Sequence, residues 1–262
     1  MKYKKKIKFS IIVVSLNTKK LFLKTINSIL KQNYKNFEII VVDGKSIDGT
    51  QNIILKKKKY FSKYIIERDK GIYHAMNKGI SLSKGEWIIF MNSGDTFFSK
   101  LILENISKKN FTKFDVIFGD TLIDHKFMNV YSKSSYFQKY TVTMPFCHQS
   151  TLVKLKYLKN NKFNLRYKLS SDFNFFLNSY SKRKLFFRYN KPISKVEASG
   201  QSDVNRQKVL TENIKIFYIK KSYLNILFLI YLKIFEFIKT LIKFFLPNKL
   251  IEYAYKIKYY KL

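Results

Sequence analysis

Polar side chains that can bind ligands or accept protons follow four apolar runs of the sequence. Asn17 comes after SIIVVSL, Asp43 after FEIIVV, Asp69 shortly after YIIE, and Asp95 in the turn that follows EWIIFM. Short apolar runs with β-branched and aromatic residues are typical of buried strands. Parallel strands end at the same edge of a sheet, and open α/β sheets bind their ligands there, so we expect these four side chains to gather in one site.

An acidic edge of this kind can bind a ligand in two ways. Carboxylates accept hydrogen bonds from NH and OH groups, and hard cations such as Mg²⁺ or Mn²⁺ take oxygen ligands and often bridge to substrate phosphates. Taken singly, Asp43 or Asp48 is more often a turn or cap residue than a ligand. The recurrence of such residues at several strand ends favours a binding site.

Helical patterns alternate with the expected strands. A stripe of apolar residues that starts at Phe22 predicts a helix after Asn17 and Thr18, which are natural N-cap residues. Apolar residues at every fourth position from Ile72 predict another helix, with Gly85 as its C-terminal cap. Strands separated by helices imply crossover connections, and hence an α/β fold with a mostly parallel sheet covered by helices on both faces. The expected strands are residues 8–14, 37–42, 64–67, 86–91 and 115–118, the last ending before Gly119.

The composition excludes several classes of protein. The 262 residues, 46% of them hydrophobic and 17% aromatic, suffice for a folded α/β domain with an appendage and argue against disorder. A single cysteine rules out an internal disulfide framework and fits a reducing compartment. The start MKYKKKIKFSIIVVSLN has a short apolar run and no small-residue cleavage site, so we interpret it as a first buried strand and not as a signal peptide.

The formal net charge of +34 first suggests nucleic acid as a partner, because Lys and Arg neutralise phosphates. The lysines, however, are spread through the chain, and Lys, Asn, Ile, Phe and Tyr are all abundant while Gly and Pro are scarce, which indicates a general coding bias. We therefore expect no nucleic-acid role. We still expect the protein to be attracted to anionic surfaces, membrane lipids included, because such attraction requires only positive charge and no localised patch.

Four segments in order, SIIVVSLN, IIVVDGKSIDGT, ERDKGIYHAMNKGI and GEWIIFMNSGD, resemble the donor half of glycosyltransferase family 2. The resemblance runs from about Phe9 to Asp95 and extends more weakly, through PFCHQS and LSSDF, to about Ser202. It is strongest to the branch that builds bacterial exopolysaccharide, capsule or lipopolysaccharide O-chains. The resemblance implies the GT-A fold, a Rossmann-like α/β domain that binds nucleotide sugars.

The resemblance also assigns donor-binding roles. It matches Asp43 to the aspartate that hydrogen-bonds the nucleotide base, and Ser15 and Asn17 to the strand end beside the base and ribose. Asp69 matches a second contact to the base or ribose. The expected donor is a nucleotide-diphosphate sugar.

A metal site is implied at the turn Asn92-Ser93-Gly94-Asp95. Asp95 matches the last aspartate of the family's DxD motif, whose carboxylate holds Mn²⁺ or Mg²⁺ on the diphosphate. The sequence lacks the first aspartate of that motif, so Asn92 or Ser93 is expected to contact the sugar or metal through water. Breaking a sugar–phosphate bond places negative charge on the leaving diphosphate, which a cation can neutralise.

Asp172 is the candidate general base. A hydroxyl is a poor nucleophile, so a positioned carboxylate must take its proton. Asp172 opens the helical stretch DFNFFLNSY, and the resemblance matches it to the catalytic aspartate, which implies inversion at the anomeric carbon. The alternative role is an N-cap of that helix, and both roles are compatible. His148 and Gln149 resemble a pair near the acceptor or diphosphate, whereas Cys147 and His148, adjacent on an expected strand, would point to opposite faces and make no thiol–base pair.

The C-terminal segment YLNILFLIYLKIFEFIKTLIKFFL, residues 223–246, has a different character. It is long enough to span a bilayer, but its charged residues would be costly there. On a helix, the charged positions fall within an arc of about 120°, which predicts an amphipathic helix that binds an anionic membrane surface. The alternative is a helix that packs on the catalytic domain or on a second subunit.

The hypothesis from the sequence is an inverting, metal-dependent glycosyltransferase of the hexosyl or N-acetylhexosaminyl class. It would move a sugar, with UDP the expected nucleotide, to a growing, lipid-linked cell-surface glycan such as capsule or lipopolysaccharide. We expect a glycosyltransferase domain over 1–205, with a donor half at about 1–120 and an acceptor half at about 121–205, and a membrane-associating segment over 206–262. The expected location is cytoplasmic, peripheral on the inner face of the cytoplasmic membrane, and homo-oligomer formation is left open. The competing class is a non-catalytic nucleotide- or polyanion-binding protein at the membrane surface.

Overall fold

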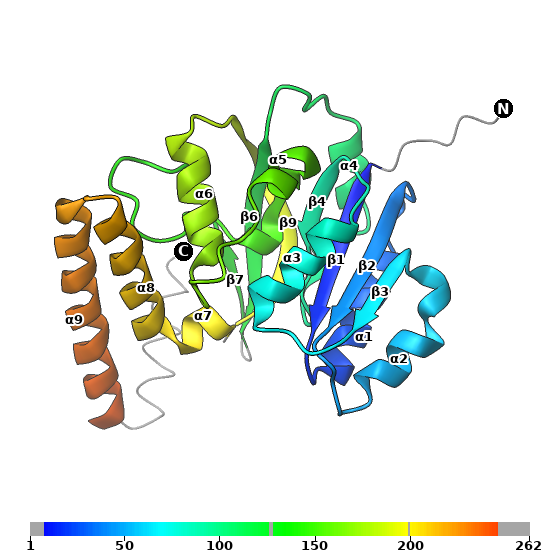
Figure 1. Cartoon of the computed structure of the whole chain (residues 1–262), viewed down its shortest axis with the longest axis horizontal. Helices are drawn as coiled ribbons and strands as arrows, with labels where there is room; N and C mark the ends of the chain where they lie inside the picture. Colours follow the sequence, from blue (N-terminus) through cyan, green and yellow to red (C-terminus); the bar gives the residue numbers. More distant parts are fainter. Residues whose placement is uncertain (1–7, 126–127, 199, 246–262) are drawn as a thin grey trace. The chain divides into compact units, whose positions relative to one another are not determined.

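The fold is described from a computed structural model, which covers residues 8–125, 128–198 and 200–245. The chain divides into two compact units, Met1–Phe137 with Met144–Ala198, and Gln138–Thr143 with Ser199–Leu262. The first unit contains the sheet, and the second contains three helices, α7 to α9 (Figure 1). The functional boundary that the sequence predicts after residue 205 stays a prediction.

Four parallel strands form the first half of the sheet, as the apolar runs predict. Their order is β3-β2-β1-β4, so the first strand of the chain lies between the second and the fourth. The strands alternate with helices along the chain, which is the pattern of crossover connections. The bounds are Phe9–Ser15 (β1), Phe37–Asp43 (β2), Lys63–Ile66 (β3) and Trp87–Phe90 (β4).

The second half of the sheet is mixed. After β4 the order continues β8-β6-β9-β5, with β7 paired to the outer part of β6. Strand β8 is antiparallel to both of its neighbours, and β9 is parallel to β6. The bounds are Thr96–Phe97 (β5), Val116–His125 (β6), Met128–Ser132 (β7), Thr151–Lys154 (β8) and Phe186–Glu197 (β9).

The prediction that a strand ends before Gly119 is wrong. Strand β6 continues through Gly119 to His125, with a shift of its register against β9 on either side of Asp120. A Cβ atom at Gly119 would lie 2.7 Å from Ile193 Cγ1, so the glycine permits the close approach of β9. Asp120 is buried and accepts hydrogen bonds from Tyr131, Ser134 and Arg188. It is a structural residue within the sheet.

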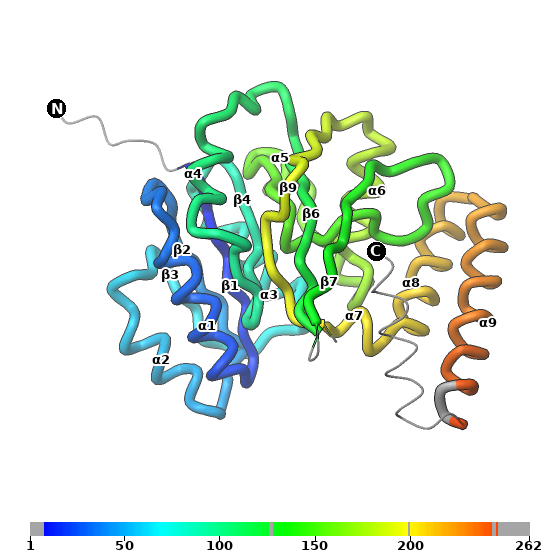
Figure 2. Tube along the Cα trace, turned by 180° about the vertical axis from the view of Figure 1, so that it is seen from behind, coloured from blue at the N-terminus to red at the C-terminus, as the bar shows by residue number. Residues whose placement is uncertain are grey.

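Helices cover both faces of the sheet, as predicted (Figures 1 and 2). On one face, side chains of α1, α2 and α4 join the inward residues of the strands in one apolar cluster, which includes Phe22, Ile54 and Leu103. On the other face lie α3, α5 and α6, joined by aromatic contacts between Phe163 and the rings of Tyr73 and Phe175. The bounds are Lys19–Leu30 (α1), Thr50–Lys56 (α2), Ile72–Leu82 (α3), Ile102–Ser107 (α4), Leu155–Asn160 (α5) and Ser171–Ser181 (α6).

Gly85 does not cap helix α3. The helix ends at Leu82, its C-cap Ser83 is extended, and Gly85 is not among the glycines with positive φ. A Cβ atom at Gly85 would lie 2.7 Å from the backbone of Phe9 and Ser10, so this position needs glycine because the chain passes directly against β1.

The second unit contains α7 (Gln201–Val204), α8 (Arg206–Ile219) and α9 (Tyr223–Phe245). The predicted C-terminal helix is therefore present, and its last expected residue, Leu246, lies outside the described residues. Helices α8 and α9 pack on each other, and Lys233 Nζ of α9 donates a hydrogen bond of 2.8 Å to Thr211 Oγ1 of α8. None of the described helices is long and apolar enough to cross a membrane.

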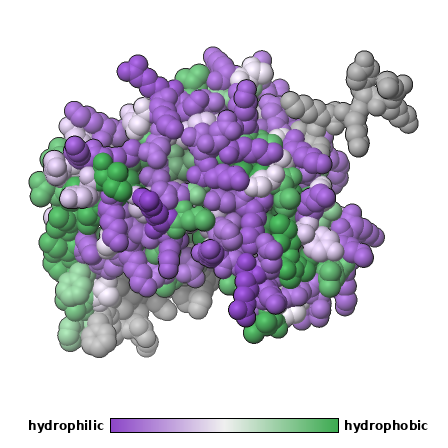
Figure 3. Space-filling view, viewed as in Figure 1, coloured by the Kyte–Doolittle hydropathy of each residue, from purple (hydrophilic) through white to green (hydrophobic). Residues whose placement is uncertain are grey.

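Helix α9 exposes its apolar face, whereas an ordinary surface helix exposes its polar face and buries its apolar one. Its polar residues Asn225 and Lys233 are buried or half-buried, whereas most of its large apolar side chains are exposed. Figure 3 shows a strip of hydrophobic surface over α9, in contrast to the largely hydrophilic surface drawn elsewhere on this face. The exposed set is Tyr223, Leu224, Leu227, Phe228, Ile230, Tyr231, Ile234, Phe235, Phe237, Ile238, Leu241, Ile242 and Phe245.

Candidate active site

Asp43, at the end of β2, has its carboxylate fixed by two serines. In the ladder of β1 and β2, Ser15 is the register partner of Asp43, and Ser15 Oγ donates a hydrogen bond of 2.7 Å to Asp43 Oδ2. Ser46, in the loop that follows β2, donates through its backbone N–H to Oδ1 at 2.8 Å and through its hydroxyl to Oδ2 at 2.6 Å. The carboxylate is buried, so these donors compensate its loss of water and hold it in one orientation.

Asn17 and Asp48 join the loops after β1 and β2. Asn17 has a positive φ of 52°, and its Oδ1 accepts a hydrogen bond of 2.8 Å from the backbone N–H of Ile47. Of the two predicted N-cap residues, Thr18 is confirmed as the N-cap of α1, although it makes no side-chain capping bond, and Asn17 is not the N-cap. Asp48 Oδ2 instead accepts from the N–H of Lys19, the first residue of α1, at 2.8 Å. The capping carboxylate therefore comes from a different loop.

Asp69 lies beside the end of β2, as predicted for a residue of the same edge. Its Oδ1 accepts a hydrogen bond of 2.8 Å from the N–H of Gly71, the N-cap residue of α3. Its Oδ2 lies 2.7 Å from the point where a Cβ atom of Gly44 would be. Gly44 directly follows Asp43, so the structure brings two of the predicted carboxylate residues to one place.

Asp95 closes a tight turn after β4. The backbone N–H of Asn92 donates to Asp95 Oδ2 at 3.0 Å, and Gly94 in the turn has a positive φ of 106°. Thr25 of α1 ties the turn to the first helix, since its hydroxyl donates to the carbonyl of Asp95 at 2.8 Å. Ser93 Oγ donates to the carbonyl of Val14 at 3.2 Å, so the turn also contacts the end of β1.

Burial raises the pKa of Asp95 from 3.8 to about 7. The positive charge of His148 and the N–H of Asn92 act in the opposite direction, and the nearby carboxylate of Glu197 raises the pKa further. The side chain is 6% exposed, so the charged form has little access to water. A group that binds here with positive charge would stabilise the carboxylate.

Asp172 and His148 form a close pair. His148 Nδ1 lies 3.0 Å from Asp172 Oδ2, and the hydroxyl of Tyr73 donates to Asp172 Oδ1 at 2.7 Å. Burial alone would raise the pKa of Asp172, but the hydrogen bond and charge of His148, followed by the bonds from Tyr73 and the N–H of Phe173, hold that pKa below its ordinary value. The N-cap of α6 is Ser170, so Asp172 lies inside the first turn of the helix and does not cap it.

The pair reaches the turn after β4 through the other nitrogen of the imidazole. His148 Nε2 lies 3.4 Å from Asn92 Nδ2, and the charge of His148 acts on Asp95. Gln149 also reaches this turn, because its side chain hydrogen-bonds Asp95 and its Oε1 accepts from Cys147 Sγ at 2.7 Å. The predicted residues Asp95, His148, Gln149 and Asp172 thus form one connected group.

The segment around Cys147 is not a strand, contrary to the expectation. Residues His148–Ser150 form a short 3₁₀ helix directly after Cys147. The conclusion that Cys147 is no nucleophile agrees with its environment, because burial, and next the negative charge of Asp95, raise the pKa of the thiol to about 12.

The thiol of Cys147 is therefore expected to react slowly. With a pKa of about 12, roughly one thiol in 10⁴ is ionised at pH 8, and only the thiolate reacts with Ellman's reagent. We expect the native protein to be labelled at least a hundredfold more slowly than the protein in guanidinium chloride, where a normal thiol pKa is restored. Labelling at 412 nm measures both rates. Native and unfolded rates within tenfold of each other would contradict the raised pKa of this thiol.

Two residues near the site were not predicted. Tyr73 carries the hydroxyl that orients Asp172, and it is separated from Asp172 by 99 positions in the sequence. Glu197, the last residue of β9, lies close to Gly94, with Oε2 3.8 Å from the point where a Cβ atom of Gly94 would be, and it pairs with Lys24 at 2.7 Å. Glu197 could have been found by the criterion used for the other acidic residues, because it ends a strand.

The oxygen atoms around Asp95 fit a hard cation. Within the described part of the chain, no group of three or more His, Cys, Asp or Glu is arranged to hold a metal ion. Asn92 Oδ1, however, is buried without a hydrogen-bond partner, and it lies in the same turn as the buried carboxylate of Asp95. Such a donor set suits Mg²⁺ or Mn²⁺, which accept phosphate oxygens and water as most of their ligands.

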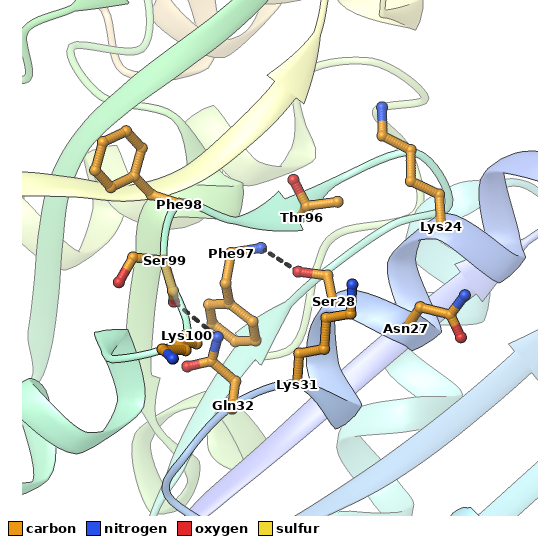
Figure 4. A pocket seen from close by; sticks show the side chains of 10 residues that line it. All are labelled: Lys24, Asn27, Ser28, Lys31, Gln32, Thr96, Phe97, Phe98, Ser99 and Lys100. Carbon is orange, nitrogen blue, oxygen red and sulfur yellow. Dashed lines mark hydrogen bonds between the residues drawn. The ribbon is translucent and has the colours of Figure 1, made fainter.

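A hollow in the described surface lies elsewhere. It has a volume of about 450 Å³ and lies between α1 and the chain around β5, lined by ten residues that include Lys24, Lys31 and Lys100 (Figure 4). None of the predicted site residues lines it. Gln32 closes one side through a hydrogen bond of 2.8 Å to the carbonyl of Ser99. This hollow is therefore separate from the acidic edge of the sheet.

Sequence comparisons give relatives that are named as glycosyltransferases. A glycosyltransferase of PGL/p-HBAD biosynthesis from Mycobacterium bovis (strain BCG / Pasteur 1173P2) is 27% identical over 190 residues, which cover 69% of this chain and 73% of that protein. An uncharacterized glycosyltransferase of Rickettsia bellii (strain RML369-C) is 28% identical over 203 residues, which cover 74% of this chain and 29% of that protein.

Solved structures share the fold. S. aureus TarS 1–349 in complex with UDP-GlcNAc matches with a TM-score of 0.61 at 19% identity, over 80% of this chain and 66% of that one. The mannosyltransferase PcManGT from Pyrobaculum calidifontis, in complex with GDP-Man and Mn²⁺, matches with a TM-score of 0.62 at 15% identity, over 83% of this chain and 65% of that one. The chain thus spans slightly less than two thirds of these structures.

The sequence model of glycosyl transferase family 2 matches residues 10–176, which contain the β1–β4 sheet, the turn of Asp95 and the pair of His148 and Asp172. The chain therefore belongs to glycosyl transferase family 2 and is a glycosyltransferase with the GT-A fold.

Proposed function

We propose that the protein moves a sugar from a nucleotide-diphosphate donor, with UDP as the expected nucleotide, to a growing, lipid-linked cell-surface glycan. One observation carries this proposal. The buried carboxylate of Asp43, the turn of Asp95 and the pair of Asp172 and His148 lie next to one another around the ends of β1, β2 and β4. The neighbours solved with UDP-GlcNAc and with GDP-Man and Mn²⁺ support a donor of this class.

The donor side consists of Ser15, Asn17, Asp43, Asp69 and Ser93. The N–H groups of a nucleotide base and the hydroxyls of ribose are donors, and carboxylates are the matching acceptors. Asp43 is already held in one orientation by Ser15 and Ser46, so binding a base costs little further ordering.

Gly44→Ala is expected to weaken nucleotide binding at least tenfold. The added methyl group would lie 2.7 Å from Asp69 Oδ2, so this carboxylate must shift from the position in which it is proposed to bind the nucleotide. Calorimetric titration with UDP measures the loss. The matched test is the double variant Gly44→Ala/Asp69→Ala, which should bind no more weakly than Asp69→Ala alone. If the affinity loss of the double variant equals the sum of the losses of Gly44→Ala and Asp69→Ala, the methyl group does not act through Asp69. The role assigned to Asp69 in this prediction then fails.

Asp95 would hold the divalent cation, with Asn92 Oδ1 and the carboxylate of Glu197 as further oxygens nearby. A bound Mn²⁺ or Mg²⁺ supplies positive charge that stabilises the departing nucleoside diphosphate. Burial raises the pKa of Asp95 to about 7, so a bound cation would favour the ionised carboxylate, which would attract that cation at the position where the turn meets β1.

The acceptor side consists of Asp172, His148 and Gln149. The attacking hydroxyl must lose its proton as its oxygen bonds to the anomeric carbon, and Asp172 is the carboxylate that activates it. Attack from the side opposite the diphosphate inverts the configuration of that carbon. The one buried carboxylate of this group with a lowered pKa, Asp172, stays ionised at neutral pH and so remains available for this role.

The test of this function is nucleotide release. The purified protein is incubated with UDP-glucose, UDP-GlcNAc or GDP-mannose, with Mn²⁺ or with EDTA, and the free nucleoside diphosphate is measured. Metal-dependent release from one donor supports the proposal. A thermal shift with a nucleotide but no release from any donor would favour the alternative of a non-catalytic nucleotide-binding protein, and no shift at all would favour a polyanion binder.

We also propose that α9 attaches the protein to an anionic membrane surface on the cytoplasmic side, where a lipid-linked acceptor would be met. The exposed apolar face of α9 supports this, because an ordinary surface helix would expose its polar side. Basic residues outnumber acidic ones throughout the sequence after residue 205, which favours anionic lipid over a neutral partner.

Vesicle sedimentation tests the attachment. Leu227 and Phe237 of α9 are 64% and 58% exposed, so Leu227→Glu/Phe237→Glu should reduce binding to phosphatidylglycerol vesicles at least tenfold without loss of folding. The matched control is Leu185→Glu, at a site of the first unit that is 50% exposed. Undiminished binding by the double variant, or a concentration-dependent dimer that the double variant abolishes, would assign the face to another role, in the second case to a second copy of the chain.

A further inference from the structure

We propose that the hollow between α1 and β5 is a binding site for an organic phosphate, in which the phosphate group is attached to a sugar or to a lipid headgroup. The residues that line it all lie between positions 24 and 100, so they belong to one compact unit of the chain. None of them is a residue of the proposed donor or acceptor side, so the inference does not depend on glycosyl transfer.

The lining of the hollow is basic and contains no acidic residue. Lys24 of α1 and Lys31, directly after α1, lie on one wall, and Lys100 lies on the other (Figure 4). Within the described part of the chain, no acidic side chain forms an ion pair with Lys31 or Lys100. Ammonium groups around one concave space repel one another, and a bound anion relieves that repulsion.

Lys24 does have an acidic partner, but the pair is exposed. Lys24 Nζ lies 2.7 Å from Glu197 Oε1, and the two side chains are 40% and 42% exposed. An ion pair so open to water contributes little to stability. An anion in the hollow can therefore share the ammonium group of Lys24 with Glu197.

The C-terminal end of α1 also lies at this hollow. The last carbonyl groups of a helix carry partial negative charge, which would repel an anion. Lys35 Nζ, however, donates a hydrogen bond of 2.9 Å to the carbonyl of Leu30, the last residue of α1. The ammonium group of Lys31 adds a second positive charge at the same end. These two cations offset the helix dipole beside the hollow.

The charge of the lining favours phosphate over carboxylate. A phosphate monoester carries about 1.5 to 2 negative charges at pH 7, whereas a carboxylate carries one. Lysine binds phosphate as a point charge, so several ammonium groups around one space attract the more highly charged anion more strongly.

The hollow is larger than a phosphate group needs. Its volume is about 450 Å³, and Lys24 and Lys31 are about 10 Å apart along the helix axis. Phe98, which is 45% exposed, supplies apolar surface, and Asn27 and Thr96 supply polar groups. This mixture suits the hydroxyl and CH groups of a sugar or a glycerol, so we infer an organic phosphate and not the inorganic ion.

Calorimetric titration of the full-length protein in metal-free buffer tests the site. The probes are glucose 1-phosphate, a soluble sugar phosphate, and dihexanoyl phosphatidic acid, a soluble lipid. We expect Lys31→Ala/Lys100→Ala to weaken binding by about tenfold or more, because two of three cations are lost. Both side chains are exposed, so the variant should stay folded. Lys56→Ala/Lys58→Ala removes the same charge from exposed lysines outside the hollow and should leave the affinity unchanged.

Lysine acetylation locates the bound phosphate. Acetyl N-hydroxysuccinimide labels exposed lysines, and mass spectrometry of the peptides gives the rate at each position. At a ligand concentration of about ten times Kd, about one site in ten is free, so acetylation of Lys31 and Lys100 should slow by up to about tenfold. The rates at Lys56 and Lys58 should not change.

The two probes distinguish the sources of the phosphate. Tighter binding of glucose 1-phosphate identifies a soluble sugar phosphate, and tighter binding of the lipid identifies a headgroup. Either result supports the site if Lys31→Ala/Lys100→Ala weakens it.

Three results would overturn the inference. They are no detectable binding of either probe, binding that Lys31→Ala/Lys100→Ala does not diminish, and equally tight binding of glucuronate, which is a sugar carboxylate. None of them bears on the release of nucleoside diphosphate, which tests the proposed function separately.

Discussion

Asp95→Asn is expected to lower turnover by about 10²–10³-fold and, in the absence of metal, to make the protein more stable at pH 8. The loss of activity follows from the role proposed for Asp95, because an amide lacks the charge that holds a cation on the diphosphate. The gain in stability follows from the burial of this carboxylate, which is 6% exposed and must be ionised at pH 8.

The expected pH dependence of stability has a definite sign. The pKa of Asp95 is about 7 in the folded state and 3.8 in a model compound, so the folded state binds the proton more tightly. The contribution of Asp95 to the free energy of unfolding should therefore be greatest below pH 3.8. This contribution should fall as the pH rises to about 7. Three pKa units correspond to a loss of up to about 4 kcal/mol.

Urea unfolding in EDTA between pH 4 and pH 8 measures this effect. The wild-type protein should lose stability over that range relative to Asp95→Asn, and added Mn²⁺ should reduce the difference. Asp203→Asn makes the same change of charge in the second unit and should leave the wild-type profile in place. Parallel pH profiles for the wild-type protein and Asp95→Asn would show that this carboxylate is not the buried, costly charge described above.

Glu38→Ala is expected to reduce the free energy of unfolding by about 3 kcal/mol. Glu38 is 4% exposed, and its Oε1 accepts hydrogen bonds from Ser10 Oγ at 2.6 Å and from the backbone N–H groups of Lys84 and Gly85 at 2.6 and 3.1 Å. Alanine leaves the buried Ser10 hydroxyl and the N–H of Lys84 without this acceptor, whereas the N–H of Gly85 keeps its second hydrogen bond, of 2.9 Å, to Ser10 Oγ. The bonds also join β1, β2 and the turn before β4, so their loss affects three parts of the sheet.

Glu38→Gln is the control for this prediction. Its amide oxygen can replace Oε1 as acceptor, so the expected loss is about 1 kcal/mol. Chemical denaturation with an unchanged m-value measures both variants. Equal losses for the alanine and glutamine variants would show that the charge of Glu38, and not the set of three hydrogen bonds, is what stabilises the sheet.

The parallel half of the sheet could be predicted from the sequence because its signals are local. Runs such as FEIIVV form strands that are buried on both faces, and their ends agree with the expected ends within about one residue. The wrong predictions concern positions whose role depends on distant parts of the chain. Gly85 is needed because β1 passes against it, and Asp48 caps a helix that begins 29 positions earlier. No local pattern contains those neighbours.

The same distinction applies to the active site. Asp43 and Asp95 could be found because each directly follows a recognisable strand, and Asp172 because it matches a motif. The partnership of Asp172 with His148 and Tyr73 could not be predicted, because it joins the 3₁₀ helix after Cys147 and the helix α3 to the start of α6. The packing of these three helices determines whether the carboxylate contacts a substrate or another side chain.

The segment Gln138–Thr143 belongs to the helical unit although it lies in the middle of the chain. Asn213 of α8 donates a hydrogen bond of 2.9 Å to the carbonyl of Val142, and the chain crosses between the units after residues 137, 143 and 198. The helical hairpin is therefore not a detachable tail. A chimera that exchanges only the residues after Ala198 with those of a relative would leave Val142 without its matching asparagine, so the two segments must be exchanged together to keep the unit intact.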